Sequence, residues 1–145
     1  MFKFLRSNKT YDFYLAGGMR GYPDLNKPMF TKVARLLRQK GFTIWNPSEH
    51  GSYLELSYAE CMKRDLNAVI NECRGIALLP GWRDSIGANA EAFVAYVCNK
   101  YIVEVRFIYH TLPTGSTKIA LVDIDLSDYR LPYNKDATQS FNPHE

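Results

Sequence analysis

Apolar and polar residues follow one another along the chain in blocks that predict strands alternating with helices. The predicted strands are short apolar runs, bounded by turn-forming residues, at 11–16, 42–45, 75–80, 101–105 and 119–124. The predicted helices have an apolar residue every third or fourth position and lie at 28–40, 58–71 and 88–99. This alternation favours right-handed crossovers and a parallel sheet that helices cover on both faces.

Two of the predicted helices have a clear inward stripe. The first helix is framed by Pro28, which suits a first turn, and by Gly41, which suits the position just past a helix end. Its stripe consists of Phe30, Val33, Ala34, Leu36 and Leu37. The inward positions of the second helix are Cys61, Met62, Leu66, Val69 and Ile70.

The length of 145 residues and the 46% hydrophobic content suit one domain with a substantial core. We expect an α/β, single-domain, three-layer Rossmann or flavodoxin-like fold over residues 1–126, with a mostly parallel sheet of about five strands. Residues 127–145 contain two prolines and many polar side chains. We expect this tail to be partly disordered or to pack on a partner subunit.

Charge and cysteine usage narrow the possible partners. The net charge of +3 comes from scattered Lys and Arg residues, which argues against polymeric nucleic acid and membrane surfaces but permits a small anionic ligand. No apolar run reaches about 18 residues, and we expect a soluble cytoplasmic protein. Three cysteines without a CxxC pair read as buried free thiols, namely Cys61, Cys73 and Cys98. His50 and His110 have no second histidine at metal spacing, so we expect no metal and no cofactor.

Two loops follow predicted strands and belong on one rim, because ligands bind outside the carboxyl ends of strands in open α/β sheets. The first loop, Gly17–Gly21, can bring backbone amides close to a phosphate while Arg20 supplies a charged donor. Taken alone, the loop is also compatible with a tight turn that carries an exposed arginine. The second loop runs from Gly81 into the helix that carries Glu91.

Two acidic residues stand in helical contexts. Glu91 is expected in the first turn of its helix, either as a solvated residue stabilised by the helix dipole or as a functional carboxylate. Asp65, taken alone, reads as a solvated acid on a helix surface. Neither residue decides the function by itself.

The order of these features carries more information than any one of them. It consists of Tyr14, the Gly17–Gly21 loop, Asp65-Leu66-Asn67 and Ser85-x-Gly87-x-x-x-Glu91. Over about residues 11–105 this order resembles the nucleoside 2-deoxyribosyltransferase superfamily, most closely its 2′-deoxynucleoside 5′-phosphate N-hydrolase branch. The resemblance implies that Glu91 attacks C1′ of the sugar, that Asp65 acts as an acid or orienting group, and that Tyr14 positions the nucleophile. It implies substrate contacts by Gly17, Gly18, Met19, Arg20, Gly21, Ser85, Gly87 and Asn89.

Ser85 indicates which branch the chain resembles. The transferases tend to carry an aspartate six residues before the nucleophile, whereas the monophosphate hydrolases carry a serine that helps bind the 5′-phosphate. The resemblance therefore implies hydrolysis of a (deoxy)nucleoside 5′-monophosphate to free base and sugar phosphate, by a homodimer or larger homo-oligomer. A deoxyribosyltransferase and a non-catalytic nucleotide-binding module remain alternatives. Asp84 lies next to Ser85 and carries a negative charge, so the sequence leaves open whether the electrostatic potential here attracts or repels a phosphate.

Overall fold

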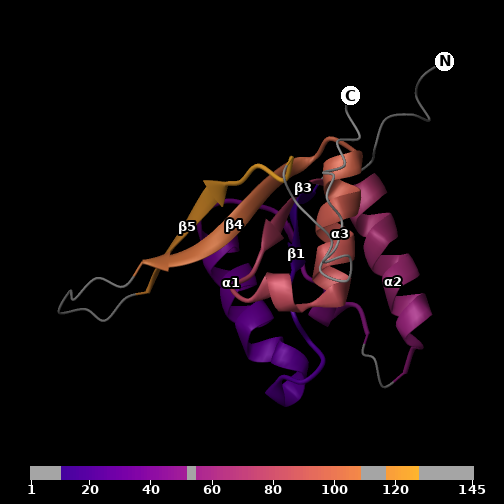
Figure 1. Cartoon of the computed structure of the whole chain (residues 1–145). Coiled ribbons are helices and arrows are strands. Elements are labelled where there is room, and N and C mark those ends of the chain that lie inside the picture. Colours follow the sequence, from indigo (N-terminus) through magenta and orange to yellow (C-terminus); the bar gives the residue numbers. More distant parts are fainter. Residues whose placement is uncertain (1–10, 52–54, 109–116, 128–145) are drawn as a thin grey trace.

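A five-stranded sheet forms the middle layer of the protein (Figure 1). The structure is a computed structural model, and it describes residues 11–51, 55–108 and 117–127. The strands are β1 (Tyr11–Ala16), β2 (Ile44–Trp45), β3 (Cys73–Leu78), β4 (Tyr101–Ile108) and β5 (Lys118–Asp123). They lie in the order β2-β1-β3-β4-β5, and the first four are parallel. This confirms the predicted α/β fold with a mostly parallel sheet of five strands.

Helices cover both faces of this sheet (Figure 1). Helix α1 (Lys27–Gln39) packs on one face, and α2 (Tyr58–Asn67) and α3 (Ile86–Val97) lie on the other. Short helical turns occupy Pro23–Asn26, Pro47–Glu49, Ala68–Glu72 and Trp82–Asp84. Within the described ranges, no helix is both long and apolar enough to cross a bilayer.

Helix α1 follows its sequence pattern closely. Four of its five predicted inward residues are fully buried, and Leu36 is half-buried. Gly41 follows the helix with a φ of 98°, the left-handed conformation that glycine adopts without steric cost. The apolar stripe and both end signals therefore predicted this helix to within one residue.

Helix α2 ends earlier than its pattern predicts. It stops at Asn67, and a π-helical turn over Ala68–Glu72 leads into β3. A wider turn rotates the residues that follow, so that Ala68 and Val69 are buried while Ile70 is 42% exposed. The prediction that Ile70 faces inward is therefore wrong.

Strand β5 departs from a fully parallel sheet, because it pairs with β4 in the antiparallel sense. The connection between Ile108 and Lys118 is shorter than the dozen or so residues that a parallel crossover needs. Beyond β5, Leu126 is buried in the core. The prediction for the tail lies almost wholly outside the described residues.

The cysteines only partly match their prediction. Cys61 and Cys73 are buried free thiols, as expected. Cys98 is exposed, because it follows the last residue of α3 instead of lying on the inward side of the helix. The prediction of three buried thiols is therefore wrong for Cys98.

The sheet order places a crevice next to β1. The chain steps from β1 outward to β2 on one side and then to β3 on the other, so the connections leave the ends of β1 and β3 in opposite directions. Such a switch point opens a crevice at the carboxyl ends of the two strands. Both loops singled out in the sequence begin there.

Candidate active site

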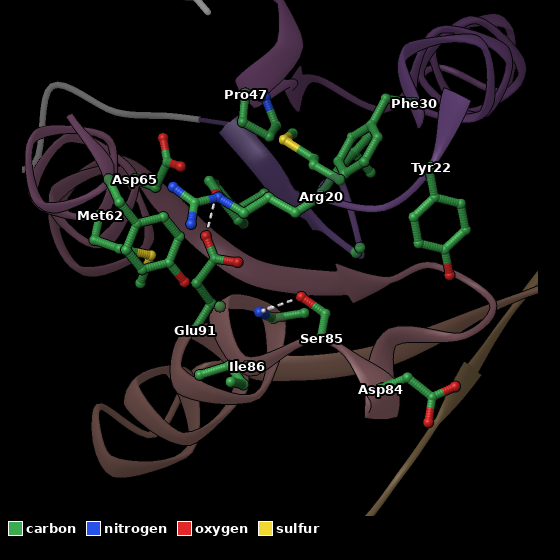
Figure 2. A pocket seen from close by; sticks show the side chains of 18 residues that line it. Arg20, Tyr22, Phe30, Pro47, Met62, Asp65, Asp84, Ser85, Ile86 and Glu91 are labelled. Carbon is green, nitrogen blue, oxygen red and sulfur yellow. Dashed lines mark hydrogen bonds between the residues drawn. The ribbon is translucent and has the colours of Figure 1, made fainter. Parts of the chain in front are cut away.

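A cavity of about 350 Å³ opens at the carboxyl ends of β1 and β3 (Figure 2). Its walls come from the loop after β1, the start of α1, the segment after β2, helix α2 and the first two turns of α3. The volume lies at the small end of the range typical of small-molecule sites. The two predicted loops therefore do share one rim.

Glu91 lies in the wall of this cavity and is 5% exposed. Helix α3 begins at Ile86, two residues earlier than predicted, because Ser85 caps it. This places Glu91 in the second turn and not in the first. The Tyr14 hydroxyl donates a hydrogen bond to Oε2 of the Glu91 carboxylate.

Tyr14 is held firmly under the cavity. It belongs to β1, in the interior of the sheet, and its side chain is buried. Its ring stacks on Trp45, with 5.3 Å between the ring centroids. The stacking on Trp45 therefore restricts rotation of the Tyr14 ring and fixes the position of the hydroxyl that contacts Glu91.

Asp65 enters the same cavity from α2 (Figure 2). It shares one face of the helix with Tyr58 and Met62, which lie seven and three residues before it and also line the cavity. Asp65 is 2% exposed, and its Oδ1 accepts a hydrogen bond from Nε of Arg64 at 2.8 Å. Its interpretation as a solvated surface acid is therefore wrong.

Burial dominates the electrostatics of both carboxyl groups. It raises the pKa of Glu91 well above its ordinary value, and the charge of Asp65 adds to the rise, while the Tyr14 hydrogen bond and the charge of Arg64 oppose it. Burial also raises the pKa of Asp65, against the opposing effects of Arg64 and Tyr14. The cavity thus holds two carboxyl groups that both keep a proton more readily than in water.

The start of α3 supplies hydrogen-bond donors to the cavity. Ser85 Oγ accepts the backbone N–H of Ala88 at 3.2 Å, which leaves its own hydroxyl proton available to donate. The first amides of any helix have no intrahelical acceptor and attract anions. A β-carbon on Gly87 would lie 3.1 Å from the Tyr58 hydroxyl, so the absence of a side chain lets α2 and α3 approach here.

Arg20 reaches over the cavity from the loop after β1. Its guanidinium lies 4.2 Å from the centre of the Tyr58 ring, and in Figure 2 the side chain extends toward the side where Asp65 and Glu91 lie. Gly17, Gly18 and Met19 also line the cavity. A β-carbon on Gly18 would come within 2.6 Å of the ring of Tyr22, so a side chain here would require this exposed ring to move.

Two predicted substrate contacts take other positions. Gly21 is exposed, has a φ of 84° and is not among the described residues that line the cavity. Asn89 is buried behind the cavity wall, where its Nδ2 donates to the carbonyls of Arg83 at 2.9 Å and Ser85 at 2.6 Å. Both residues shape the two loops, and neither faces the cavity.

Sequence reasoning missed several residues of the site. Tyr58 and Met62 could have been found from their helical spacing to Asp65, since residues three and seven positions apart share a face. Pro47 lines the cavity from the segment after β2, and no local signal announced it. Among residues 11–51, 55–108 and 117–127, no three acidic, histidine or cysteine side chains gather as metal ligands would.

Comparison with known proteins identifies a family whose description names no function. No curated protein matches the chain. A family model described as "Domain of unknown function (DUF4406)" matches residues 11–104, which run from β1 into β4 and include Tyr14, Asp65 and Glu91. Since this match covers more than half of its length, the chain belongs to the DUF4406 family.

Proposed function

We propose that this protein is an N-glycosidase that hydrolyses a (deoxy)nucleoside 5′-monophosphate to free base and (deoxy)ribose 5-phosphate. The observation that carries the proposal is the hydrogen bond from Tyr14 to Glu91 in a cavity that Asp65 also lines. Two carboxyl groups that act on one anomeric carbon form the usual machinery of glycoside cleavage. The order of these residues along the chain, which resembles the 2′-deoxynucleoside 5′-phosphate N-hydrolases, supports the same reaction.

The proposed reaction has two steps. In the first, the Glu91 carboxylate attacks C1′, and the bond from C1′ to the base nitrogen breaks. The electron pair of that bond goes to the base, which takes a proton from Asp65. Burial raises the pKa of both carboxyl groups, and the reactive form of the site is the one in which Asp65 carries the proton and Glu91 is ionised. In the second, water attacks C1′, the ester bond to Glu91 breaks, and the proton of water passes to the Asp65 carboxylate. Both carboxyl groups then return to their starting forms.

The 5′-phosphate is proposed to bind at the start of α3. The Ser85 hydroxyl and the backbone amides of Ile86 and Gly87, the first two residues of the helix, provide neutral donors. Arg20 provides a positive charge across the cavity. Asp84 also lines the cavity, but in Figure 2 its side chain points away from Ser85 and Glu91. This arrangement favours a phosphorylated substrate over a free nucleoside.

The proposal includes cytoplasmic location and assembly into a homodimer or larger homo-oligomer. Tyr101 is 73% exposed, and Phe93 and Tyr96 of α3 are only half-buried. Aromatic side chains of this kind are enriched where subunits meet.

A panel of nucleoside and deoxynucleoside 5′-monophosphates tests the reaction. The purified protein is incubated with each nucleotide, and free base is separated by chromatography. Release of base together with one equivalent of sugar phosphate supports the proposal. Transfer of the sugar to an added base faster than to water would favour the transferase instead. Nucleotide-dependent thermal stabilisation without any base release would mean a binding module.

Tyr14→Phe is expected to move the acid limb of the pH profile for kcat/KM to higher pH. The hydroxyl stabilises the ionised Glu91, so its loss lets burial raise the pKa of this carboxyl further. Asp65 and Arg64 also act on the pKa of Glu91 and are unchanged in the variant. Initial rates of base release between pH 4 and 9 measure the effect, with Tyr11→Phe on the exposed end of β1 as the control. An unmoved acid limb would contradict the role given to Tyr14.

A further inference from the structure

Arg64 makes an unusual contact with its neighbour in sequence. Adjacent residues on a helix point about 100° apart and do not normally face each other. Here the Arg64 side chain folds back so that its Nε lies 2.8 Å from Oδ1 of Asp65. The side chain of Asp65 is 2% exposed and that of Arg64 is 22% exposed, so one member of this ion pair is buried and the other reaches solvent.

The far side of the guanidinium is fixed as well. Nη1 of Arg64 donates hydrogen bonds to the backbone carbonyls of His50 and, at 3.4 Å, Gly51. The guanidinium lies 5.9 Å from the centre of the Trp45 ring, on which His50 stacks at 4.0 Å. Arg64 therefore bridges α2 to the segment after β2.

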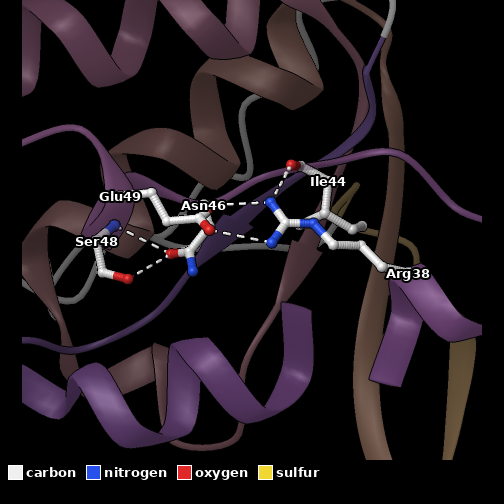
Figure 3. A network of polar contacts seen from close by, with 5 residues as sticks. All are labelled: Arg38, Ile44, Asn46, Ser48 and Glu49. Carbon is white, nitrogen blue, oxygen red and sulfur yellow. Dashed lines mark hydrogen bonds and ion pairs between the residues drawn. The ribbon is translucent and has the colours of Figure 1, made fainter. Parts of the chain in front are cut away.

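That segment has its own attachment to the fold (Figure 3). Arg38 of α1 binds both carboxylate oxygens of Glu49, at 3.0 and 2.7 Å, and donates to the carbonyl of Ile44 at 3.0 Å. Asn46 Oδ1 accepts hydrogen bonds from the backbone N–H and the hydroxyl of Ser48. The carbonyls that receive Arg64 thus belong to a segment tied to the opposite layer of the domain.

We propose that Arg64 is a positioning residue for the reaction proposed above, and that it holds the Asp65 carboxyl group toward the cavity from an anchor on the His50 and Gly51 carbonyls. Arg64 is not among the described residues that line the cavity, so it acts through Asp65. The catalytic role inferred for Arg64 rests on the proposed function. The contacts themselves do not depend on that function.

The reaction gives a reason for such a partner. When Asp65 gives its proton to the leaving base, it becomes a carboxylate in a site from which water is largely excluded. A guanidinium within hydrogen-bond distance compensates that charge and restricts rotation of the carboxyl group. Among the described residues, the ionisable groups whose charges interact with Asp65 are Arg64, Tyr58 and Cys61 on its own helix, Tyr14 on β1, His50 after β2 and Glu91 on α3.

Three variants separate charge from geometry. Arg64→Gln removes the charge, and Arg64→Lys keeps it. A lysine carries its donors on a single nitrogen, so it cannot reproduce the separate contacts that Nε makes to Asp65 and Nη1 makes to the His50 carbonyl. Lys63→Gln, at the exposed preceding position of α2, is the matched control for loss of one positive charge.

The first measurement is the titration of the Asp65 carboxyl carbon by NMR in the ligand-free protein, which needs no activity. We expect Arg64→Gln to shift the midpoint to higher pH, and Arg64→Lys and Lys63→Gln to leave it near that of the wild type. The second measurement is kcat for base release. We expect about a 100-fold loss in Arg64→Gln and about a 10-fold loss in Arg64→Lys, with no loss in the control.

Each result decides a separate question. A midpoint in Arg64→Gln equal to that of Lys63→Gln would overturn the inference, whether or not the enzyme is active. Full kcat in Arg64→Lys would mean that Arg64 acts by charge alone, which would also overturn its positioning role. If Arg64→Gln does not fold, Arg64→Lys carries the test. Absence of base release by the wild type would remove the proposed function and leave the titration to decide whether Arg64 holds Asp65.

Discussion

Glu91→Gln is expected to lower kcat/KM for base release by about 1000-fold or more. Glutamine has nearly the shape of glutamate and can still accept the Tyr14 hydrogen bond, but its amide oxygen is a far weaker nucleophile. The loss should appear in kcat at saturating nucleotide, with little change in the affinity for the substrate. Glu60→Gln, at an exposed position of α2, is the control for removal of one glutamate charge.

The same variant is expected to be more stable than the wild type at neutral pH. Burial raises the pKa of Glu91 in the folded state above its value in the unfolded chain, so the folded state binds the proton more tightly. The stability associated with this group is therefore fully present below about pH 4.3 and is lost as the pH rises through the folded-state pKa. Glutamine has no such loss, and we expect a gain of about 1–3 kcal/mol in the free energy of unfolding at neutral pH.

Denaturant unfolding of both proteins at pH 4 and pH 7.5 measures this difference. The gain should be present at the higher pH and nearly vanish at the lower one, where the wild-type carboxyl is protonated in the folded state and largely protonated in the unfolded chain. If the variant and the wild type have the same free energy of unfolding at both pH values, ionising Glu91 does not destabilise the folded state. A variant that is stable and inactive would separate catalysis from folding, whereas a fully active Glu91→Gln protein would rule out Glu91 as the nucleophile.

The sequence predicted the fold where local patterns agree with the final packing. The stripe of α1, from Phe30 to Leu37, and its glycine terminator needed only spacing and conformational preference. Strand β5 was placed correctly, but its direction depends on the length of its connection to β4. The end of α2 was misplaced because the π-helical turn at Ala68 keeps the same apolar residues and only changes their rotation.

The site was predicted less evenly. Tyr14, Asp65 and Glu91 come from three separate elements, and order along the chain brought them into one hypothesis before any contact was known. Their burial could not be predicted, because a lone aspartate on a helix looks solvated until its cationic partner and the covering segment are placed. Arg64 gave no signal, since residues adjacent on a helix are not expected to pair.

Arg20→Ala and Ser85→Asp are each expected to lower the binding affinity for nucleoside monophosphates by about 100-fold. The affinity for the corresponding nucleosides should stay nearly unchanged. Arg20 carries the positive charge that reaches over the cavity, and its loss removes a charge-assisted contact to the phosphate. Aspartate at position 85 can still cap α3, which Ser85 does by accepting the Ala88 amide. Its carboxylate would repel a phosphate dianion, so this variant tests binding without removing the cap.

Ser85→Ala completes the comparison, because it loses the hydroxyl donor and the cap together. We expect it to lower the binding affinity for nucleotides by about 10-fold. It should also lower the free energy of unfolding by about 1 kcal/mol, the usual cost of losing such a cap. Calorimetric titration with a nucleotide and its nucleoside, carried out on protein that also carries Glu91→Gln to prevent turnover, measures each affinity. A preference for the nucleoside in Ser85→Asp would place the phosphate next to the start of α3. Equal losses for both ligands in Arg20→Ala and Ser85→Asp would rule out the phosphate contacts proposed for these two residues.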